Sequence, residues 1–228
     1  MSKSKLQLLR ERAAKPKAQT HQPENVRQQH YRILIVCEGE QTEPNYFRSL
    51  AKDKKYTAVL SVEIRGIGRG TTSLVKEAMK LKQNLEHTNF LEFDSSWVVF
   101  DEDDHKDFNQ AIDESERNGF KAAWSNEAFE LWYVLHFEYL NTGITRKAYI
   151  DKLNDILRKK LKNAKYKYEK NDPAFYRLLQ QYGNEELAKK FAKKLRNLYT
   201  GTNYSAHKPC TTVDQLVEEL KFPERYIH

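Results

Sequence analysis

The order of strand-type and helix-type segments predicts an α/β protein, with a mostly parallel sheet flanked by helices and a helical extension at the C-terminus. Two apolar runs, ILIVC at 33–37 and SWVVF at 96–100, have the composition of strands that are buried on both faces. Segments with helix start and stop signals separate the expected strands. This alternation is typical of a parallel sheet built with right-handed crossovers.

The expected strands and helices follow one another without an internal repeat. Pro44 lies in the first turn of the first helix, a position that proline favours. The hydroxyl residues at 71–73 are expected to cap the second helix, and Gly119 is expected to end the third. The predicted strands are 33–37, 58–64, 96–100 and 120–124, and the predicted helices are 44–52, 71–86, 108–118 and 128–137.

The 228 residues divide into three expected segments. Residues 1–30 are basic and lack apolar periodicity, so we expect a disordered N-terminal arm. Residues 31–140 are expected to form the α/β domain. Residues 141–228 are expected to be a helical cap on the same core, with a helical pattern that is interrupted only at Pro173 and at 201–209.

Composition and charge restrict the function classes. The net charge is +7, with basic blocks at 1–30 and 146–170 around an acidic stretch at 91–117. This suits a polyanionic substrate held over an acidic site, although lysine-rich helices are also ordinary solvated surfaces. No apolar run approaches the roughly 20 residues of a membrane span, and Cys37 and Cys210 make no disulfide scaffold. We therefore expect a cytoplasmic protein with no membrane partner.

The clearest signal of chemistry is CEGEQTE at 37–43, an acidic turn directly after the first strand. Carboxylates at the end of a buried strand are costly unless a cation or a proton neutralises them. The carboxyl ends of parallel strands are also where α/β proteins bind ligands. The segment predicts a metal-dependent catalytic site with Glu38 as a ligand, while Glu40 is expected to face solvent.

A second acidic element, FDEDDH at 100–105, follows the strand 96–100. Residues two apart in an extended segment face the same side, so Asp101 and Asp103 can point together, with Glu102 on the other side. If this strand neighbours the first, Glu38 joins the two aspartates. Three hard oxygen ligands suit Mg²⁺ or Mn²⁺. An acidic loop at a sheet edge is the alternative interpretation.

Three glycines at 66, 68 and 70 fit neither the dinucleotide fingerprint nor the phosphate-binding P-loop. They predict a flexible turn, in which Arg65 and Arg69 can contact a phosphate backbone.

The basic block offers further nucleic-acid contacts. Lys165 and Lys167 alternate with Tyr166 and Tyr168, a pattern that suits a basic–aromatic surface for a single strand. Lys170 can stabilise phosphate charge in a transition state, or it is an ordinary solvated lysine.

Several other polar residues allow two interpretations. Glu130, on an otherwise apolar helix, is either a metal ligand or the partner of a core Arg or Lys. His136 is expected to be a core histidine rather than a ligand, and His105 a surface residue rather than a general base. Ser125 and Asn126 are expected to cap the following helix rather than to touch substrate.

These motifs also resemble known families. A glutamate after the first strand and a DxD after a later strand look like the Toprim fold of topoisomerases, primases and overcoming-lysogenization-defect (OLD) nucleases. More closely, the chain resembles the RloB-like family over about residues 31–222. The matching segments are, in order, CEGEQTEPNYF, VVFDEDDH, SNEAFELWYVLHF, YEKNDPAFYRLL and CTTVDQLVEEL. The family form has proline where this chain has Glu127, which leaves open whether Glu127 adds a carboxylate.

The resemblance implies a Toprim-like nuclease, or a domain derived from one, in prokaryotic anti-phage or abortive-infection systems. Such proteins are often paired with an AAA or structural-maintenance-of-chromosomes (SMC)-type ATPase. The resemblance assigns general acid–base and metal-binding roles to Glu38, and Mg²⁺ binding to Asp101 and Asp103. It also makes Glu43 a ligand of a second metal.

The leading hypothesis is a divalent-metal-dependent nuclease that acts on RNA, tRNA included, or on DNA. The alternative is a non-catalytic subunit that binds nucleic acid or an ATPase partner. A third possibility, phosphotransfer on a small molecule, requires a closed pocket. The oligomeric state is open, with a homodimer as one option.

Overall fold

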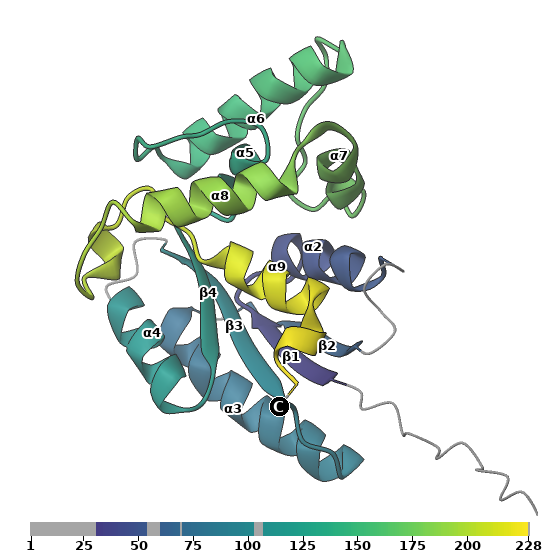
Figure 1. Cartoon of the computed structure of the whole chain (residues 1–228), viewed down its shortest axis with the longest axis vertical. Coiled ribbons are helices and arrows are strands. Elements are labelled where there is room, and N and C mark those ends of the chain that lie inside the picture. Colours follow the sequence, from purple (N-terminus) through teal and green to yellow (C-terminus); the bar gives the residue numbers. More distant parts are fainter. Residues whose placement is uncertain (1–30, 54–59, 69, 103–106, 228) are drawn as a thin grey trace, which may run out of the picture.

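The computed structural model describes residues 31–53, 60–68, 70–102 and 107–227. The predicted disordered arm, Arg69, Asp103 and His105 lie outside the described residues. The predicted fold class is confirmed: the protein has an α/β, Toprim-like arrangement of parallel strands flanked by helices, with a helical C-terminal extension (Figure 1).

The sheet has four strands in the order β2-β1-β3-β4, and every neighbouring pair is parallel. After β1 the chain forms β2 on one side and then crosses to form β3 on the other. The carboxyl ends of β1 and β3 therefore flank a topological switch point, where open α/β sheets bind ligands. The strands are β1 (Tyr31–Cys37), β2 (Leu60–Gly66), β3 (Ser95–Glu102) and β4 (Lys121–Asn126).

Helices cover both faces of the sheet (Figure 1). Helices α3 (Thr71–Asn89) and α4 (Phe108–Arg117) pack on one face, and α2 (Thr42–Ala51) and α9 (Val213–Lys221) pack on the other. The remaining helices extend the second layer beyond the carboxyl edge of the sheet. They are α5 (Glu130–Leu135), α6 (Arg146–Leu161), α7 (Phe175–Tyr182) and α8 (Glu185–Arg196).

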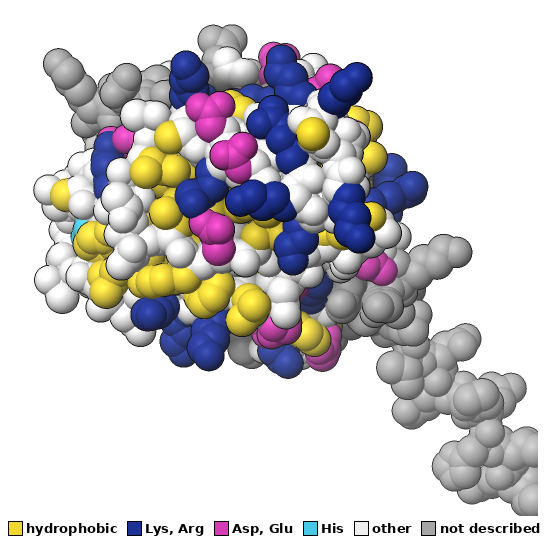
Figure 2. Space-filling view, turned by 90° about the horizontal axis from the view of Figure 1, so that it is seen from above, with side chains coloured by type: hydrophobic (Ala, Val, Ile, Leu, Met, Phe, Trp, Pro, Cys, Tyr) yellow, Lys and Arg dark blue, Asp and Glu magenta, His cyan; other side chains and the backbone are white. Residues whose placement is uncertain are grey.

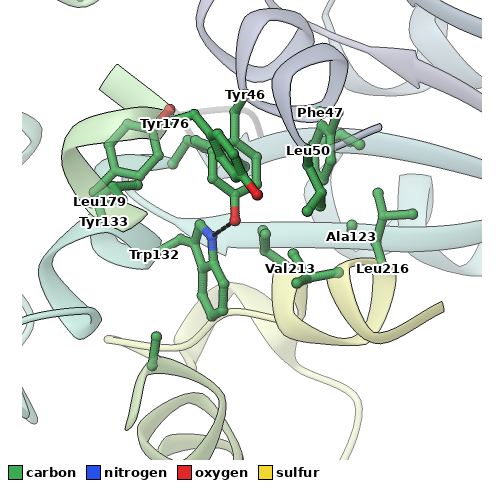
Figure 3. Packing of buried hydrophobic residues seen from close by; sticks show 14 of the residues in the cluster. Tyr46, Phe47, Leu50, Ala123, Trp132, Tyr133, Tyr176, Leu179, Val213 and Leu216 are labelled. Carbon is green, nitrogen blue, oxygen red and sulfur yellow. Dashed lines mark hydrogen bonds between the residues drawn. The ribbon is translucent and has the colours of Figure 1, made fainter. Parts of the chain in front are cut away.

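The larger apolar core joins the sheet to these C-terminal helices. Figure 3 shows Tyr46 of α2 among side chains of α5 and α7, with its hydroxyl accepting a hydrogen bond of 2.9 Å from the indole N–H of Trp132. Val213 and Leu216 of α9 lie close to Ala123 of β4 in the same core. Aromatic side chains bury large areas, so this packing holds α2 and α5 firmly where the sheet ends.

Strands β3 and β4 are longer than predicted. The run SWVVF marks the apolar part of β3, but pairing with β4 continues through Asp101 and Glu102, opposite Ser125 and Asn126. Polar residues lie inside these strands because ladder hydrogen bonds extend beyond the apolar pattern. Asp101 is thus held by the sheet itself.

The predicted hydroxyl cap of α3 is wrong. Gly70 is the N-cap, and the hydroxyls of Thr71 and Thr72 each donate a hydrogen bond of 2.6 Å to the carboxylate of Asp107. That carboxylate also accepts the backbone N–H of Thr72 at 3.2 Å. An acidic side chain from the start of α4 therefore stabilises the first turn of α3, as its negative charge favours.

The helical pattern predicted after residue 143 is wrong for the segment between α6 and α7. Helix α6 ends at Leu161, and Lys162 adopts a left-handed conformation with φ 52°. The chain has no regular structure from there until α7 begins at Phe175.

Of the described helices, none has the length and apolar character needed to cross a bilayer.

Candidate metal and catalytic site

The two predicted acidic strand ends are neighbours. Strand β1 pairs with β3, with Cys37 opposite Val99. The N–H of Glu38 extends this ladder by donating to the carbonyl of Val99 at 2.8 Å. The carboxylate of Glu38 accepts the backbone N–H of Asp101 at 3.3 Å. The arrangement on which the predicted site depends is therefore present.

The side chain of Asp101 points to the face covered by α2 and α5. It is 7% exposed, and its Oδ2 accepts the backbone N–H of Phe129 at 3.0 Å. The guanidinium of Arg146 lies 3.6 Å from the same oxygen. Arg146 also donates to the carbonyl of Glu127, at 3.1 and 3.3 Å, so the cation is fixed beside Asp101.

Glu43 enters the same region from the first turn of α2. Its side chain is buried, and its Oε2 has no hydrogen-bond partner among the described residues. The carboxylate packs directly on Gly39, where a Cβ atom would lie 2.2 Å from Oε2. A glycine at position 39 is therefore what allows Glu43 to occupy this place.

Glu130 is the third carboxylate of the region and is fully buried at 0% exposure. Its Oε1 accepts the hydroxyl of Tyr168 at 3.2 Å, whereas its Oε2 has no hydrogen-bond partner in the described structure. The partner expected for a structural Glu130 was a core Arg or Lys, but the hydrogen bond comes from a tyrosine. We call Glu43, Asp101 and Glu130 the carboxylate cluster.

Burial and the repulsion from neighbouring carboxylates make Asp101 and Glu43 hold their protons strongly. The pKa of Asp101 is raised well above its usual range by burial, and then by the charges of Glu43 and Glu130. The pKa of Glu43 is raised by burial and by Glu130, with Lys170 and Arg146 acting in the opposite direction. Carboxylates arranged in this way are stabilised by a proton or a bound cation.

Lys170 lies beside the cluster, although its side chain is exposed. Its charge lowers the pKa of Glu43. The backbone carbonyl of Lys170 accepts the hydroxyl of Thr42 at 2.8 Å, which ties this residue to the start of α2. Lys170 therefore lies near the carboxylates, and its role in stabilising phosphate charge stays a prediction.

The other predicted contact residues are more dispersed. Arg65 is exposed on β2 and pairs with Glu63 at 2.7 Å. Lys165 and Lys167 are exposed between α6 and α7. Tyr168 is only 4% exposed, so its predicted role in stacking on a nucleic-acid base is wrong.

Glu127 does not join the cluster. It has φ 66°, a conformation closed to proline, and its carboxylate pairs with Lys208 at 3.0 Å. Lys208 also pairs with Glu102 at 2.7 Å, which makes a separate acid–base group.

The predicted capping role of residues 125 and 126 is wrong. Ser125 hydrogen-bonds the hydroxyl of Thr211 at 2.9 Å, and the Asn126 amide donates to the carbonyl of Tyr204 at 3.3 Å. Helix α5 has no side-chain cap. These polar residues attach the C-terminal part of the chain to the edge of β4 instead.

His136 and Cys37 are core residues. The Nδ1 of His136 lies 2.9 Å from the carbonyl of Trp132, and burial lowers its pKa to about 4, so the ring is neutral near pH 7. Burial raises the pKa of the Cys37 thiol well above its usual value. A thiol that stays protonated is not a nucleophile.

The donor chemistry of the region fits a hard cation. Glu43 and Glu130 each have a buried carboxylate oxygen without a hydrogen-bond partner in the described structure, and oxygen donors of this kind suit Mg²⁺ or Mn²⁺. Among the described residues, however, no three His, Cys, Asp or Glu side chains stand close enough together to form a metal site. Asp103, a predicted ligand, lies outside those residues. The oxygen donors are therefore of the type that Mg²⁺ or Mn²⁺ binds, and the full set of ligands stays a prediction.

Sequence reasoning missed Arg146 and the link from Tyr168. Both residues lie in the basic block of the C-terminal part, more than 35 residues beyond Asp101. Membership of this basic block is the only feature of the local sequence that connects Arg146 and Tyr168 with an anionic site. Their role follows from long-range packing of α6 and the next segment against α5.

Comparison with known proteins identifies one family. Residues 33–220 match the model of a family described as RloB-like protein. Neither the curated proteins nor the solved structures contain a match to the chain.

Proposed function

The chain belongs to the RloB-like family, and we propose that it is a divalent-metal-dependent nuclease that hydrolyses phosphodiester bonds in RNA or DNA. The observation that carries the proposal is the carboxylate cluster at the switch point between β1 and β3. Its members are buried, two of them keep a carboxylate oxygen without a partner, and cations stand at its border. Charges placed at such cost in stability are typical of functional sites.

Glu38, Asp101 and Asp103 would hold an ion, Mg²⁺ or Mn²⁺, and Glu43 would be available to a second one. When bound, such an ion neutralises phosphate charge and lowers the pKa of a coordinated water. Arg146 fixes the orientation of the Asp101 carboxylate. In hydrolysis a water oxygen bonds to phosphorus, the bond to the leaving oxygen breaks, and Glu38 exchanges the proton involved, as the resemblance implies. Lys170 offsets charge on the phosphate.

In the cell we propose that the protein is the effector of an anti-phage or abortive-infection system, paired with an AAA or SMC-type ATPase. This role rests on the family resemblance. A toxic nuclease needs control, and a partner that responds to infection would supply it.

The test is incubation of the purified full chain with tRNA, single-stranded RNA, plasmid DNA and linear DNA, each with Mg²⁺ and with Mn²⁺. The key variant is Asp101→Asn, with Glu102→Gln as the matched control. Glu102 is the next residue on the same strand, but its carboxylate pairs with Lys208 outside the cluster. We expect wild type and Glu102→Gln to cleave at least one substrate and Asp101→Asn to cleave none. Cleavage by Asp101→Asn at the wild-type rate overturns the proposal.

The low exposure of the cluster favours a second candidate, a subunit that binds nucleic acid or an ATPase without catalysis. Asp101 and Glu43 are 7% and 6% exposed, so access for a phosphate is restricted. Oligonucleotide binding by a protein that cleaves none of these substrates supports this second candidate.

A further inference from the structure

Residues 159–170, which we call the basic segment, concentrate positive charge next to the carboxylate cluster. The segment contains six lysines and one glutamate, a formal charge of +5. All six lysine side chains are exposed, at positions 159, 160, 162, 165, 167 and 170. Figure 2 looks down on this side of the molecule and shows Lys and Arg side chains over much of the face, with some Asp and Glu between them.

Five of these lysines have no acidic partner within the described part of the chain, and the sixth, Lys170, acts electrostatically on Glu43. Lys159 and Lys160 lie in the last turn of α6, where the helix dipole favours a cation. The dipole acts only within that turn, so it does not account for Lys165 and Lys167. Unpaired cations beyond a helix end are available to an anionic partner.

The basic segment is tied to the cluster by buried contacts. Tyr168 donates its hydroxyl to Glu130 at 3.2 Å and its backbone N–H to the side chain of Asn154 at 2.6 Å. Its ring contacts that of Phe175, with a centroid distance of 4.8 Å. Two residues later, Thr42 binds the carbonyl of Lys170. The exposed lysines on either side of Tyr168 are therefore held at a set position relative to the carboxylates.

The same contacts decide what the segment can recognise. Tyr168 is buried, and Tyr166 is partly buried against the core. Lysines then supply the contacts, and a lysine binds a phosphate as a point charge rather than reading a base. Binding of this kind is independent of sequence and weakens steeply with salt.

We propose that the basic segment binds the phosphate backbone of the nucleic acid on which the carboxylate cluster acts, and that Tyr168 is the positioning residue that joins the two. The inference rests on the proposed function and names the surface that delivers the substrate. The shared chemistry is a phosphodiester backbone, supplied by RNA or by DNA.

The first experiment measures binding without cleavage. Fluorescence anisotropy of labelled single-stranded RNA, single-stranded DNA and duplex DNA is recorded with the full chain in EDTA, from about 50 to 200 mM salt. The variant Lys165→Gln/Lys167→Gln is compared with Lys190→Gln/Lys193→Gln. The control pair lies exposed on α8 and removes the same charge.

Loss of two phosphate contacts with a single strand should reduce the slope of log K against log salt by about 1.4. Near 0.1 M salt this is a loss of affinity of tenfold or more. The control pair should keep wild-type affinity within about twofold, since its charges lie on another helix, outside the basic segment. Equal losses in both variants, or no loss in either, overturn the inference. The three labelled ligands show which nucleic acid binds best.

The second experiment tests the hydrogen bond from Tyr168 to Glu130. Tyr168→Phe keeps the ring and removes the hydrogen bond to Glu130, and Tyr149→Phe is the matched control. Tyr149 is also buried, and its hydroxyl has no hydrogen-bond partner within the described structure. We expect Tyr168→Phe to lower kcat about tenfold, the size expected for one hydrogen bond to a charged group, with KM unchanged. It should also weaken Mn²⁺ binding measured by calorimetry, which needs no catalysis.

If Tyr168→Phe matches Tyr149→Phe in both measurements, the positioning role is wrong. Cleavage that is unaffected by the Lys165/Lys167 variant overturns the inference and leaves the nuclease proposal intact. Selective loss of binding in a protein that cleaves nothing supports the binding surface and overturns the nuclease proposal.

Discussion

Buried carboxylates occur in two regions of this molecule, and their partners differ. Around α9, Asp214 accepts hydrogen bonds of 2.5 and 2.8 Å from Arg196, one to each oxygen. Glu219 accepts the Tyr31 hydroxyl at 3.2 Å on one oxygen and Lys121 at 2.6 Å on the other. At the switch point, Glu43 and Glu130 each keep an oxygen without a partner in the described structure.

The difference lies in the counter-ion. Asp214 and Glu219 accept hydrogen bonds from Arg196 and Lys121. Glu185, which also keeps one oxygen without a partner among the described residues, accepts a hydrogen bond from Lys221 at 2.5 Å on the other. Within the described structure, Glu43 and Glu130 accept no hydrogen bond from a cation.

A buried carboxylate that is bonded to a cation fixes one element to another, as α9 is fixed to α8 and to the sheet. A buried carboxylate with an unused oxygen and no bonded cation costs stability, and it is tolerated where it can take a proton or a metal ion. We therefore expect changes around α9 to affect folding, and changes at the carboxylate cluster to affect chemistry.

The largest expected effect is on cleavage. Asp101→Asn or Glu43→Gln removes a charged ligand, and the loss of several kcal/mol of metal-dependent stabilisation lowers the rate about a thousandfold or more. Asp214→Asn changes an equally buried aspartate outside the site and should cleave at the wild-type rate where it stays folded. Single-turnover cleavage with Mn²⁺ measures this. Equal loss of activity in all three variants would show that the carboxylate cluster is no more important for cleavage than Asp214.

For the free energy of unfolding we expect the opposite order, with the larger loss around α9 and the smaller one at the carboxylate cluster. Arg196→Ala leaves Asp214 buried without its cation, and breaking a buried pair costs about 3–5 kcal/mol. Urea unfolding measures the change in the free energy of unfolding. Glu43→Gln in the same assay should cost nothing or stabilise the protein, because it removes a charge with an unused oxygen. A larger loss for Glu43→Gln than for Arg196→Ala contradicts the comparison.

A subtler change tests the geometry of the cluster. Gly39→Ala places a methyl group where the Glu43 carboxylate now lies. The carboxylate is the far end of a flexible side chain, so it can move away with little loss of stability. We expect cleavage to fall about tenfold, since displacements near 1 Å reduce rates by up to a hundredfold, with an unfolding midpoint close to wild type. Normal cleavage by Gly39→Ala would show that the position of Glu43 does not matter.

The smallest effect is on pH dependence. Because the folded-state pKa values of Asp101 and Glu43 are raised, the folded protein holds protons that the unfolded chain loses near pH 4. Their contribution to stability is complete below that pH and is lost as pH rises through the folded-state values. In EDTA at pH 7, Asp101→Asn should therefore raise Tm by about 2–4 °C, the shift for about 1 kcal/mol in a chain of this size.

Thermal unfolding at pH 5 and pH 7.5 checks the sign. The advantage of Asp101→Asn over wild type should grow with pH. A constant difference at both pH values would mean that Asp101 titrates in the folded protein as it does in the unfolded chain.

Much of the fold was predictable because local patterns are strong in buried parallel strands. The runs at 33–37 and 96–100 identified β1 and β3, and their acidic ends are what predicts Glu38 and Asp101 as site residues. The segment between α6 and α7 was mispredicted as helical because its Lys, Glu and Ala residues favour a helix. There the burial of Tyr168 against Glu130 outweighs local preference.

The cluster was predicted only in part, for a similar reason. Glu43 and Asp101 lie near strand ends and carry a local signal. Glu130 and Arg146 reach the site because α5 and α6 fold back over the carboxyl edge of the sheet. The apolar helix around Glu130 indicated that its carboxylate needs a partner or a metal, but not where it lies, and Arg146 carries no such signal. Long-range packing of this kind is not encoded in local periodicity.

Calorimetric titration of Mn²⁺ into the metal-free full chain tests most directly whether the carboxylates at the switch point, Asp101 among them, bind a divalent cation. We expect binding by wild type and by Asp214→Asn with the same affinity, and at least tenfold weaker binding by Asp101→Asn. Equal binding by all three proteins, or no binding by wild type, would contradict this expectation.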